Sequence, residues 1–203
     1  MRIALIVEGR TEKAFVETLR RFLETRLQGN MPRLSPHVYD GRIPTDDKLS
    51  RVVDRLLNDS RQPADAVIAL TDVYTGTKAF ADAADAKGKM RQWVGPEARF
   101  HPHAAQHDFE AWLIPYWEDI QRLSGSNRKK PSQNPELVDQ NSPPAHRISE
   151  VFPTGTRGRS YVKPRDAKRI LDGKDLAIAA AQCGELKAFL NTILSLCGGD
   201  LIP

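Results

Sequence analysis

Continuous apolar runs at residues 2–7 and 65–71 constrain the fold of this chain more than any other feature of its sequence. Runs of this length without polar alternation are typical of strands that are buried on both faces of a parallel sheet. Two further strands are expected at residues 36–40 and 98–106. The sequence therefore predicts four strands.

Segments with helical periodicity lie between and after these strands. At residues 11–27 apolar side chains recur at helical spacing, and residues 46–58 place five of them on one stripe. The Ala-rich segment 78–93 favours a helix, and residues 108–123 predict a helix that is interrupted or bent near Pro115. This order of elements predicts an α/β fold with a parallel four-stranded sheet and crossover helices.

The character of the sequence changes after the fourth expected strand and its helix. Residues 125–164 contain six of the 14 prolines and a run of three basic residues. We expect them to form a basic, Pro-rich loop insertion that separates an α/β core at residues 1–124 from C-terminal helices at residues 165–203. Apolar side chains on one face of residues 185–197 indicate that these helices pack on the core.

Cysteine content and hydropathy exclude several classes of protein. The 203 residues include only two cysteines, Cys183 and Cys197, and both lie in apolar helical patterns. A disulfide scaffold is excluded, a four-ligand zinc site is disfavoured, and we expect both thiols in the core. The longest apolar stretch, at residues 3–7, is too short to cross a bilayer. We therefore expect a soluble cytoplasmic protein with no membrane partner and no secretory leader.

The net charge of +4 is unevenly distributed along the chain. Residues 121–170 hold eleven Lys/Arg against four Asp/Glu, whereas the rest of the chain is mildly acidic. A basic segment beside an acidic site suits a polyanionic substrate such as nucleic acid. A solvated loop surface that keeps the protein soluble explains the charge equally well.

Acidic residues follow three of the four expected strands, namely Glu8, Asp72 and the pair Asp108 and Glu110. Ligands of open parallel sheets collect at the carboxyl ends of strands, so these side chains are expected at one edge. Carboxylates that converge repel one another unless a divalent cation lies between them, and oxygen donors favour Mg²⁺ or Mn²⁺ over zinc. For any single one of them, a helix cap or a chance position is the simpler interpretation.

Histidines and tryptophans near the fourth strand allow other chemistry. His101 and His103 point to one face of a strand and could form a zinc pair, although the absence of a nearby cysteine makes this the weaker interpretation. His107 could transfer a proton or hold the neighbouring aspartate in place, with equal weight. Trp112 and Trp117 could stack on bases, but their helical spacing is more typical of core residues.

Five short motifs follow one another across nearly the whole chain. They are VEG-x-TE at residues 7–12, D-x-Y-x-G at 72–76, QHDFEA at 106–111, PPA-x-RI at 143–148 and Y-x-K at 161–163. On these motifs the chain resembles a small bacterial TOPRIM-like family of unknown function, related to the overcoming-lysogeny-defect nucleases. The resemblance implies the TOPRIM fold that topoisomerases and primases also use.

The resemblance also implies roles for the acidic residues. In TOPRIM enzymes the glutamate after the first strand is a general acid or base, and an Asp-x-Asp pair holds magnesium. Glu8 and Asp72 match these places, whereas Tyr74 replaces the second aspartate and is no substitute for a carboxylate ligand. Asp108 and Glu110 could restore the missing charge, and Glu110 matches the FEA step. The implied metal ligands are Glu8, Asp72, Asp108 and Glu110.

Basic residues of the expected loop complement these acids. Arg147 and Lys163 lie in the RI and Y-x-K motifs, and phosphoryl transfer needs fixed cations around the non-bridging oxygens. We expect the loop to fold over the acidic edge, so that both act as catalytic residues beside Glu8, Asp72 and Glu110. Unspecific attraction of a nucleic-acid backbone is expected from Arg128, Lys129, Lys130, Arg157 and Arg159. A purely solubilising role is the alternative for all of these cations.

These features predict a nuclease or phosphotransferase that depends on Mg²⁺ or Mn²⁺ and acts on DNA or RNA. Relatives of the fold commonly work as the nuclease partner of an ATPase in phage defence, so an ATPase partner is expected by analogy. The alternative is a non-catalytic nucleic-acid-binding or regulatory subunit with a degenerate TOPRIM site. Tyr74 at the second acidic position favours this alternative.

Overall fold

The structure is a computed structural model of the chain and describes residues 1–74, 79–131, 134–137, 142–154 and 158–203. Four parallel strands form one sheet in the order β2-β1-β3-β4. They are β1 (Arg2–Val7), β2 (Arg33–Val38), β3 (Ala66–Asp72) and β4 (Phe100–Ala105). The predicted α/β class with a parallel four-stranded sheet is confirmed.

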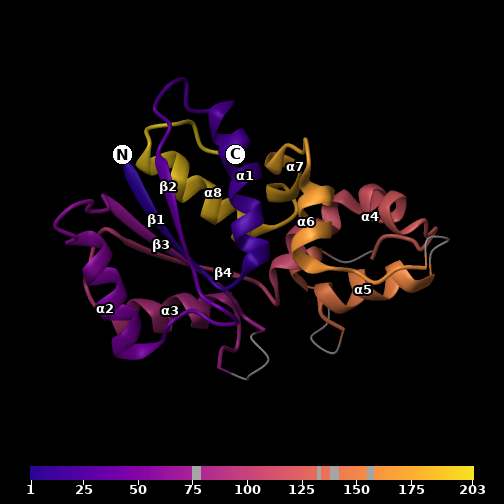
Figure 1. Cartoon of the computed structure of the whole chain (residues 1–203), viewed down its shortest axis with the longest axis horizontal. Coiled ribbons are helices and arrows are strands. Elements are labelled where there is room, and N and C mark those ends of the chain that lie inside the picture. Colours follow the sequence, from indigo (N-terminus) through magenta and orange to yellow (C-terminus); the bar gives the residue numbers. More distant parts are fainter. Residues whose placement is uncertain (75–78, 132–133, 138–141, 155–157) are drawn as a thin grey trace.

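Helices cover both faces of the sheet (Figure 1). The crossover helices are α1 (Arg10–Glu24), α2 (Asp46–Leu57) and α3 (Ala83–Val94). Successive residues of a strand point to opposite faces. Ile3 and Leu5 of β1 join the core that includes α1 and α8 (Gly184–Leu196), whereas Ala4 and Ile6 join the core that includes α2 and α3. A strand between two helical layers needs apolar side chains at every position, which explains the continuous run in β1.

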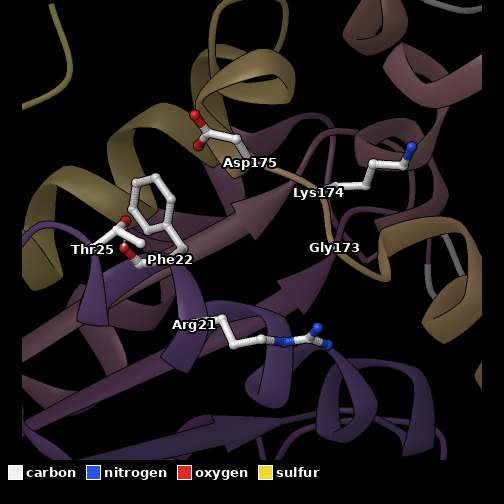
Figure 2. Close-up of a pocket in the computed structure, with 6 residues that line it drawn as sticks. All are labelled: Arg21, Phe22, Thr25, Gly173, Lys174 and Asp175. Carbon is white, nitrogen blue, oxygen red and sulfur yellow. Dashed lines mark hydrogen bonds between the residues drawn. The ribbon is translucent and has the colours of Figure 1, made fainter.

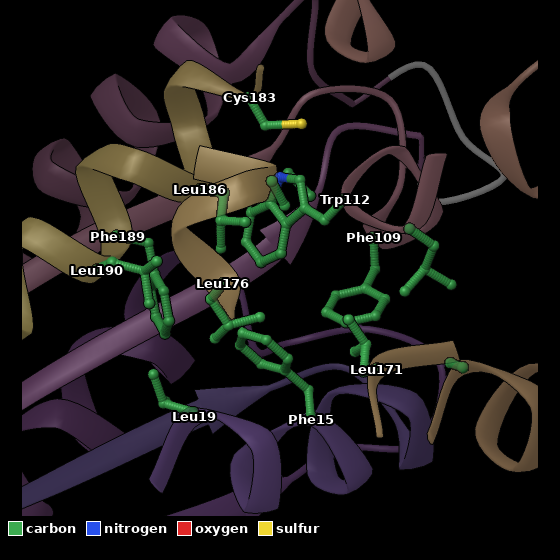
Figure 3. Packing of buried hydrophobic residues seen from close by; sticks show 14 of the residues in the cluster. Phe15, Leu19, Phe109, Trp112, Leu171, Leu176, Cys183, Leu186, Phe189 and Leu190 are labelled. Carbon is green, nitrogen blue, oxygen red and sulfur yellow. The ribbon is translucent and has the colours of Figure 1, made fainter. Parts of the chain in front are cut away.

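An aromatic cluster lies at the centre of the larger core (Figure 3). Phe15 of α1 and Phe189 of α8 contact each other and Trp112, and Phe109 contacts Phe15 and Trp112. The ring centroids in contact lie 5.3 to 6.3 Å apart. Trp112 and Trp117 are only 1% and 5% exposed, so the core interpretation of both tryptophans is confirmed. This cluster joins the sheet side of the molecule to its C-terminal helices.

The chain after β4 turns through a bend at the predicted place. The 3₁₀ helix η1 (Phe109–Tyr116) contains Pro115, and α4 (Trp117–Ser124) continues from it. The bend follows from the proline, which removes an amide donor and crowds the preceding turn. The remaining short elements are η2 (Pro135–Leu137), α6 (Lys163–Leu171) and α7 (Leu176–Ala180).

Residues 125–164 differ from the irregular loop that the sequence predicts, because they contain the helix α5 (Pro144–Thr154). Its Ile148, Val151 and Phe152 are buried, and the helix packs on α4 and η1. Pro143 and Pro144 stand at the start of the helix, where proline is tolerated because the first amides have no partner within the helix, whereas Pro153 lies near its end. Helix α5 is therefore part of the packed fold.

Both edge strands of the sheet contain a proline, and the two central strands contain none. Pro36 of β2 lies opposite Leu5 of β1, and Pro102 of β4 lies opposite Ala69 of β3. Proline lacks an amide hydrogen, so sheets tolerate it in edge strands, where one side has no neighbour. β2 begins earlier than predicted, since an exposed edge position does not require apolar side chains.

The two cysteines are free, with Cys183 buried and Cys197 partly buried against the same core. The first agrees with the expectation of a core thiol, and the second lies at the margin of the core. In the part of the chain that the structure describes, no helix combines the length and the apolar character needed to span a membrane.

Candidate functional site

The strand order creates a change of direction between β1 and β3. From β1 the chain moves outward to β2, and from β3 it moves outward to β4 on the opposite side. Open α/β sheets bind ligands at such a point, outside the carboxyl ends of the strands. Glu8 follows β1 directly and Asp72 ends β3, so both residues lie at this point.

Glu8 is a buried carboxyl group, only 6% exposed, that accepts a hydrogen bond from the hydroxyl of Thr71. Burial raises the pKa of Glu8 to about 7, and the charge of Glu12 adds to this, against the opposing effect of the Thr71 hydrogen bond. A carboxyl group with a pKa near neutrality can both take up and release a proton at physiological pH.

Glu12 belongs to the same cluster, although we did not predict it as a site residue. It lies in the first turn of α1, is 6% exposed, and has its pKa raised by burial and by the charge of Glu110. A Cβ atom at Gly9 would lie 3.0 Å from Glu12 Oε2, so glycine leaves space for this carboxylate. The VEG-x-TE motif contained the signal, but an acid in a first helical turn is usually explained by the helix dipole.

Asp72 connects β3 to the segment that follows β4. Its Oδ1 accepts a hydrogen bond from the Phe109 amide over 2.9 Å, and Phe109 is the first residue of η1. Burial raises the pKa of Asp72 well above its ordinary value, and the charges of Glu12 and Glu8 raise it further. Asp108 and Glu110, which flank Phe109, therefore lie at the same edge of the sheet as Asp72.

Asp108 and Glu110 are 3% and 1% exposed. Asp108 Oδ2 accepts a hydrogen bond from the Ala145 amide over 3.1 Å, whereas its buried Oδ1 has no hydrogen-bond partner among the described residues. Burial and the charge of Glu110 raise the pKa of Asp108 to about 7. The bond to Ala145 also ties the start of α5 to the acidic cluster.

Lys163 and Tyr161 approach this cluster from the start of α6. Lys163 Nζ lies 3.1 Å from Glu110 Oε2, and the Tyr161 hydroxyl donates to Glu110 Oε1 over 3.4 Å. Burial lowers the pKa of Lys163, but the charges of Glu110 and Asp108 outweigh it and raise the pKa. Lys163 is therefore a cation within the acidic group. Tyr161, in the same Y-x-K motif, was not predicted as a site residue.

Arg147 lies in a different group from Lys163. Its Nε donates to the Ser142 carbonyl over 3.2 Å, and its side chain lines a pocket of about 120 Å³ together with Arg128 and Lys129. Glu150 also lines this pocket, 3.7 Å from Arg128. The structure places Arg147 with two cations that we expected to attract a phosphate backbone.

Lys130 and Arg159 have other partners in the structure. Lys130 Nζ donates to Gln182 Oε1 over 2.7 Å, and Arg159 Nη1 lies 2.9 Å from Asp166 Oδ1. Arg159 is therefore engaged by a buried carboxylate of the protein itself. Arg157 falls outside the described residues.

Tyr74 and His103 each contact another part of the chain. Tyr74 is 53% exposed and donates its amide to the His107 carbonyl, while Gly76 of its motif falls outside the described residues. His103 Nε2 lies 3.0 Å from Thr192 Oγ1 at the boundary of β4 and α8. Burial and the charge of Lys87 lower the pKa of His103 to about 3.

The carboxylates have the donor chemistry of a site for Mg²⁺ or Mn²⁺. The buried, partnerless Oδ1 of Asp108 is an oxygen that such an ion would satisfy. As the side chains lie, no group of three His, Cys, Asp or Glu residues within the described ranges is arranged to hold an ion. Thr71 engages Glu8 and Lys163 engages Glu110. The donor set fits the ion, and binding would require side chains to turn from these partners.

A separate pocket of about 420 Å³ lies where the end of α1 meets the connection between α6 and α7 (Figure 2). Its lining residues are Arg21, Phe22, Thr25, Gly173, Lys174 and Asp175. The charged ends of Arg21 and Lys174 point away from the Phe22 ring and pair with Asp172 and Asp119. None of the predicted site residues lines this pocket.

Comparison with known proteins supports the fold. The C-terminal region of the Burkholderia pseudomallei OLD protein matches with a TM-score of 0.54 and 12% identity, covering 97% of this chain and 98% of its own. The C-terminal region of the Xanthomonas campestris pv. campestris OLD protein matches with a TM-score of 0.48 and 10% identity, covering 97% and 95%. The first likeness shows a shared fold.

Sequence comparison places the chain in a family. None of the curated proteins matches it. The family described as "Domain of unknown function (DUF4276)" matches residues 7–194. Because this match extends over nearly the whole sequence, the chain belongs to the DUF4276 family.

Proposed function

We propose that this protein is a nuclease that depends on a divalent cation and cleaves DNA or RNA at its carboxylate cluster. The observation that carries the proposal is the convergence of five acids, four of them with raised pKa values, at the point where the sheet changes direction. The acids are Glu8, Glu12, Asp72, Asp108 and Glu110. The fold shared with the OLD C-terminal region agrees with the TOPRIM resemblance of the motifs.

The carboxylates divide into two roles in this proposal. The ligands of Mg²⁺ or Mn²⁺ would be Glu12, Asp72, Asp108 and Glu110. Glu8, beside them, would act as the general acid and base. When bound, the cation would polarise the scissile phosphate and offset its negative charge. Glu8, with a pKa near 7, accepts a proton from the attacking water and returns one to the leaving oxygen.

Lys163 supplies positive charge from the chain itself. Its pairing with Glu110 holds the ammonium group beside the carboxylates without substrate. A non-bridging phosphate oxygen competes for the same donor, so Lys163 stabilises the charge that develops on phosphate in the transition state. Tyr161, which also contacts Glu110, keeps that carboxylate oriented while Lys163 changes partner.

The basic pocket at α4 and α5 serves binding in this proposal. Arg128, Lys129 and Arg147 line it together, and guanidinium and ammonium groups contact phosphate backbones irrespective of base sequence. We also propose that the protein acts in the cytoplasm, where a nucleic-acid substrate is present. By analogy of fold alone, we further propose that an ATPase works with this chain.

A second function is favoured by a specific observation. Tyr74 occupies the place of the second aspartate and is largely exposed, and Lys163 already neutralises Glu110. A chain in which lysine permanently replaces the cation would be a nucleic-acid-binding or regulatory subunit. The two functions differ in whether the protein binds Mn²⁺.

Calorimetric titration with Mg²⁺ and Mn²⁺, followed by cleavage assays on labelled single- and double-stranded oligonucleotides, tests the proposal. We expect saturable binding and cleavage by the parent protein, and loss of both in Asp72→Asn. Glu8→Gln separates the roles, because it should lose cleavage while binding of the ion weakens less. Glu17→Gln, an exposed glutamate on the same helix as Glu12, is the matched control. A protein that binds oligonucleotides but neither ion supports the second function.

A further inference from the structure

Asp166 of α6 forms a buried ionic centre behind Lys163. Its side chain is 0% exposed, yet it pairs with three arginines, Arg159, Arg165 and Arg169. Arg159 Nη1 lies 2.9 and 3.1 Å from its two oxygens, and Arg165 donates to both oxygens over 3.1 and 3.0 Å. Burial opposes ionisation, but the hydrogen bonds from Arg165, the Val162 amide and Arg159 hold the pKa of Asp166 below its ordinary value. Asp166 is therefore a buried anion.

The same carboxylate fixes the peptide that precedes Lys163. Asp166 Oδ2 accepts a hydrogen bond from the Val162 amide over 2.8 Å. Val162 stands between Tyr161 and Lys163, the two residues whose side chains contact Glu110. A shift of this one amide would move both contacts together.

Arg159 extends the support to the Tyr161 ring. Its guanidinium lies 4.9 Å above the centroid of the Phe152 ring, and the ring centroids of Phe152 and Tyr161 lie 5.2 Å apart. Arg159 Nη2 also reaches the Leu123 carbonyl at 3.5 Å. The ends of α4, α5 and α6 therefore meet around one arginine, which α6 holds through Asp166.

We infer that Asp166, acting with Arg159, is a positioning residue that holds the Tyr161–Lys163 segment against Glu110 before substrate binds. Buried ion pairs are poor stabilisers compared with apolar residues of similar size, whereas they fix geometry well. The site needs such support because Lys163 comes from a segment far along the chain from the sheet. The expected effect on cleavage rests on the proposed function, but the placement of Lys163 does not.

Chemical labelling of Lys163 tests the placement directly in metal-free protein. Acetic anhydride acylates a lysine faster when its amine leaves a carboxylate, and mass spectrometry reports each site. Lys168, on the exposed face of the same helix, is the internal reference. We expect faster acylation of Lys163 relative to Lys168 in Asp166→Ala. We expect a smaller increase in Asp166→Asn, which keeps an acceptor for the Val162 amide.

Two further variants calibrate this measurement. Glu110→Gln removes the carboxylate that pairs with Lys163 and gives the labelling rate of the unpaired amine. Asp172→Asn changes an exposed aspartate just after the same helix and should leave the rate unchanged. If Asp166→Ala does not fold, Arg159→Met removes one partner of the centre and replaces Asp166→Ala in the comparison. Folded Asp166 or Arg159 variants that label Lys163 at the parental rate overturn the inference.

Kinetics distinguish positioning from a purely structural role. Displacement of a catalytic group by about 1 Å can cost on the order of 100-fold in rate, so single-turnover cleavage should fall by about that factor in Asp166→Ala. The dissociation constant for the oligonucleotide should stay the same, and Asp166→Asn should cleave at an intermediate rate. Weaker binding with an unchanged rate overturns the inference. If labelling changes as expected and the parent protein cleaves nothing, the proposed function fails and the placement of Lys163 stands.

Discussion

The Nζ atom of Lys163 lies 3.1 Å from Oε2 of Glu110, although the two residues are 53 positions apart in the chain. This contact brings a cation from the start of α6 to the acids that follow β4. Without a metal ion, the lysine offsets part of the charge that the buried carboxylates would otherwise impose on one another.

Replacing Lys163 with alanine should slow cleavage by orders of magnitude and weaken binding only modestly, because the ammonium acts on charge that develops in the transition state. Single-turnover assays with Mn²⁺ over a range of protein concentrations separate the two effects. Lys168→Ala, on the same helix and paired with the exposed Glu17, is the control. A parental rate in Lys163→Ala would exclude this lysine from the site.

The amide variants Glu8→Gln, Asp72→Asn and Glu110→Gln should each abolish metal-dependent cleavage. An amide keeps the size of the side chain but cannot supply an anionic oxygen, so we expect unfolding free energies within about 1–2 kcal/mol of the parent. Oligonucleotide cleavage and urea unfolding measure the two properties. Full activity in any one variant would remove that residue from the proposed site.

The stability of the metal-free protein should fall as the pH rises through the range in which Asp108 ionises. Its pKa is about 7 in the folded protein and has an ordinary value of 3.8, so between these values the folded state binds more protons than the unfolded state. The free energy of unfolding therefore decreases with rising pH over this window, and the stabilising effect of the raised pKa is complete only below it.

Asp108→Asn isolates this effect, because asparagine does not ionise and can still accept the Ala145 hydrogen bond. Urea unfolding with EDTA should show the variant gaining stability relative to the parent as the pH rises from about 4 to about 8. Asp172→Asn should show no such trend. A constant difference between Asp108→Asn and the parent would mean that Asp108 ionises normally in the folded protein.

Neutralising Arg128, Lys129 and Lys130 together should weaken nucleic-acid binding and reduce its salt dependence by up to about three units of slope, because each phosphate contact releases about one counterion. Turnover at saturating substrate should barely change, since these contacts are equal in the ground and transition states. The position of Arg147 in the same pocket leads us to expect binding effects from Arg147→Ala as well. Fluorescence anisotropy across a salt series measures both. A large loss of rate in Arg147→Ala would restore the catalytic role expected from its motif.

Truncating Trp112 to alanine should destabilise the protein by about 3–5 kcal/mol, the usual cost of deleting a large buried aromatic side chain. Its ring contacts Phe15, Phe109 and Phe189, which come from separate elements (Figure 3). Urea unfolding measures the loss, and Trp93→Ala, at a less buried position, should cost less. A small loss at Trp112 would indicate that the core closes around the gap.

The sheet could be predicted from the sequence because its central strands are buried on both faces. Such strands leave continuous apolar runs, and the acids that follow them then lie at a known edge, as with Glu8 and Asp72. The sequence did not predict helix α5, because the adjacent prolines Pro143 and Pro144 are typical of a turn. The helix is stabilised by the burial of its apolar side chains against other elements. The local sequence pattern determines the central strands, whereas tertiary packing determines helix α5.

The candidate site was only partly predictable for a similar reason. Glu12 lies in a helix, where acids are common, and only its burial beside Glu8 marks it. The sequence grouped Arg147 with Lys163 through their motifs, whereas in the structure Arg147 lines a pocket with Arg128 and Lys129, and Lys163 pairs with Glu110. The sequence predicts Arg159 as a cation that attracts nucleic acid, whereas in the structure it pairs with the buried Asp166. Pairings between distant segments leave no local pattern.

The prolines in the two edge strands have a consequence for association between molecules. An exposed strand edge is a template on which a second chain can add strands and begin an aggregate. Pro36 and Pro102 interrupt the row of amide donors along β2 and β4, so neither edge offers a continuous ladder to an incoming strand. Each edge therefore lacks one amide donor that an added strand would use, which makes strand addition from a second molecule less favourable.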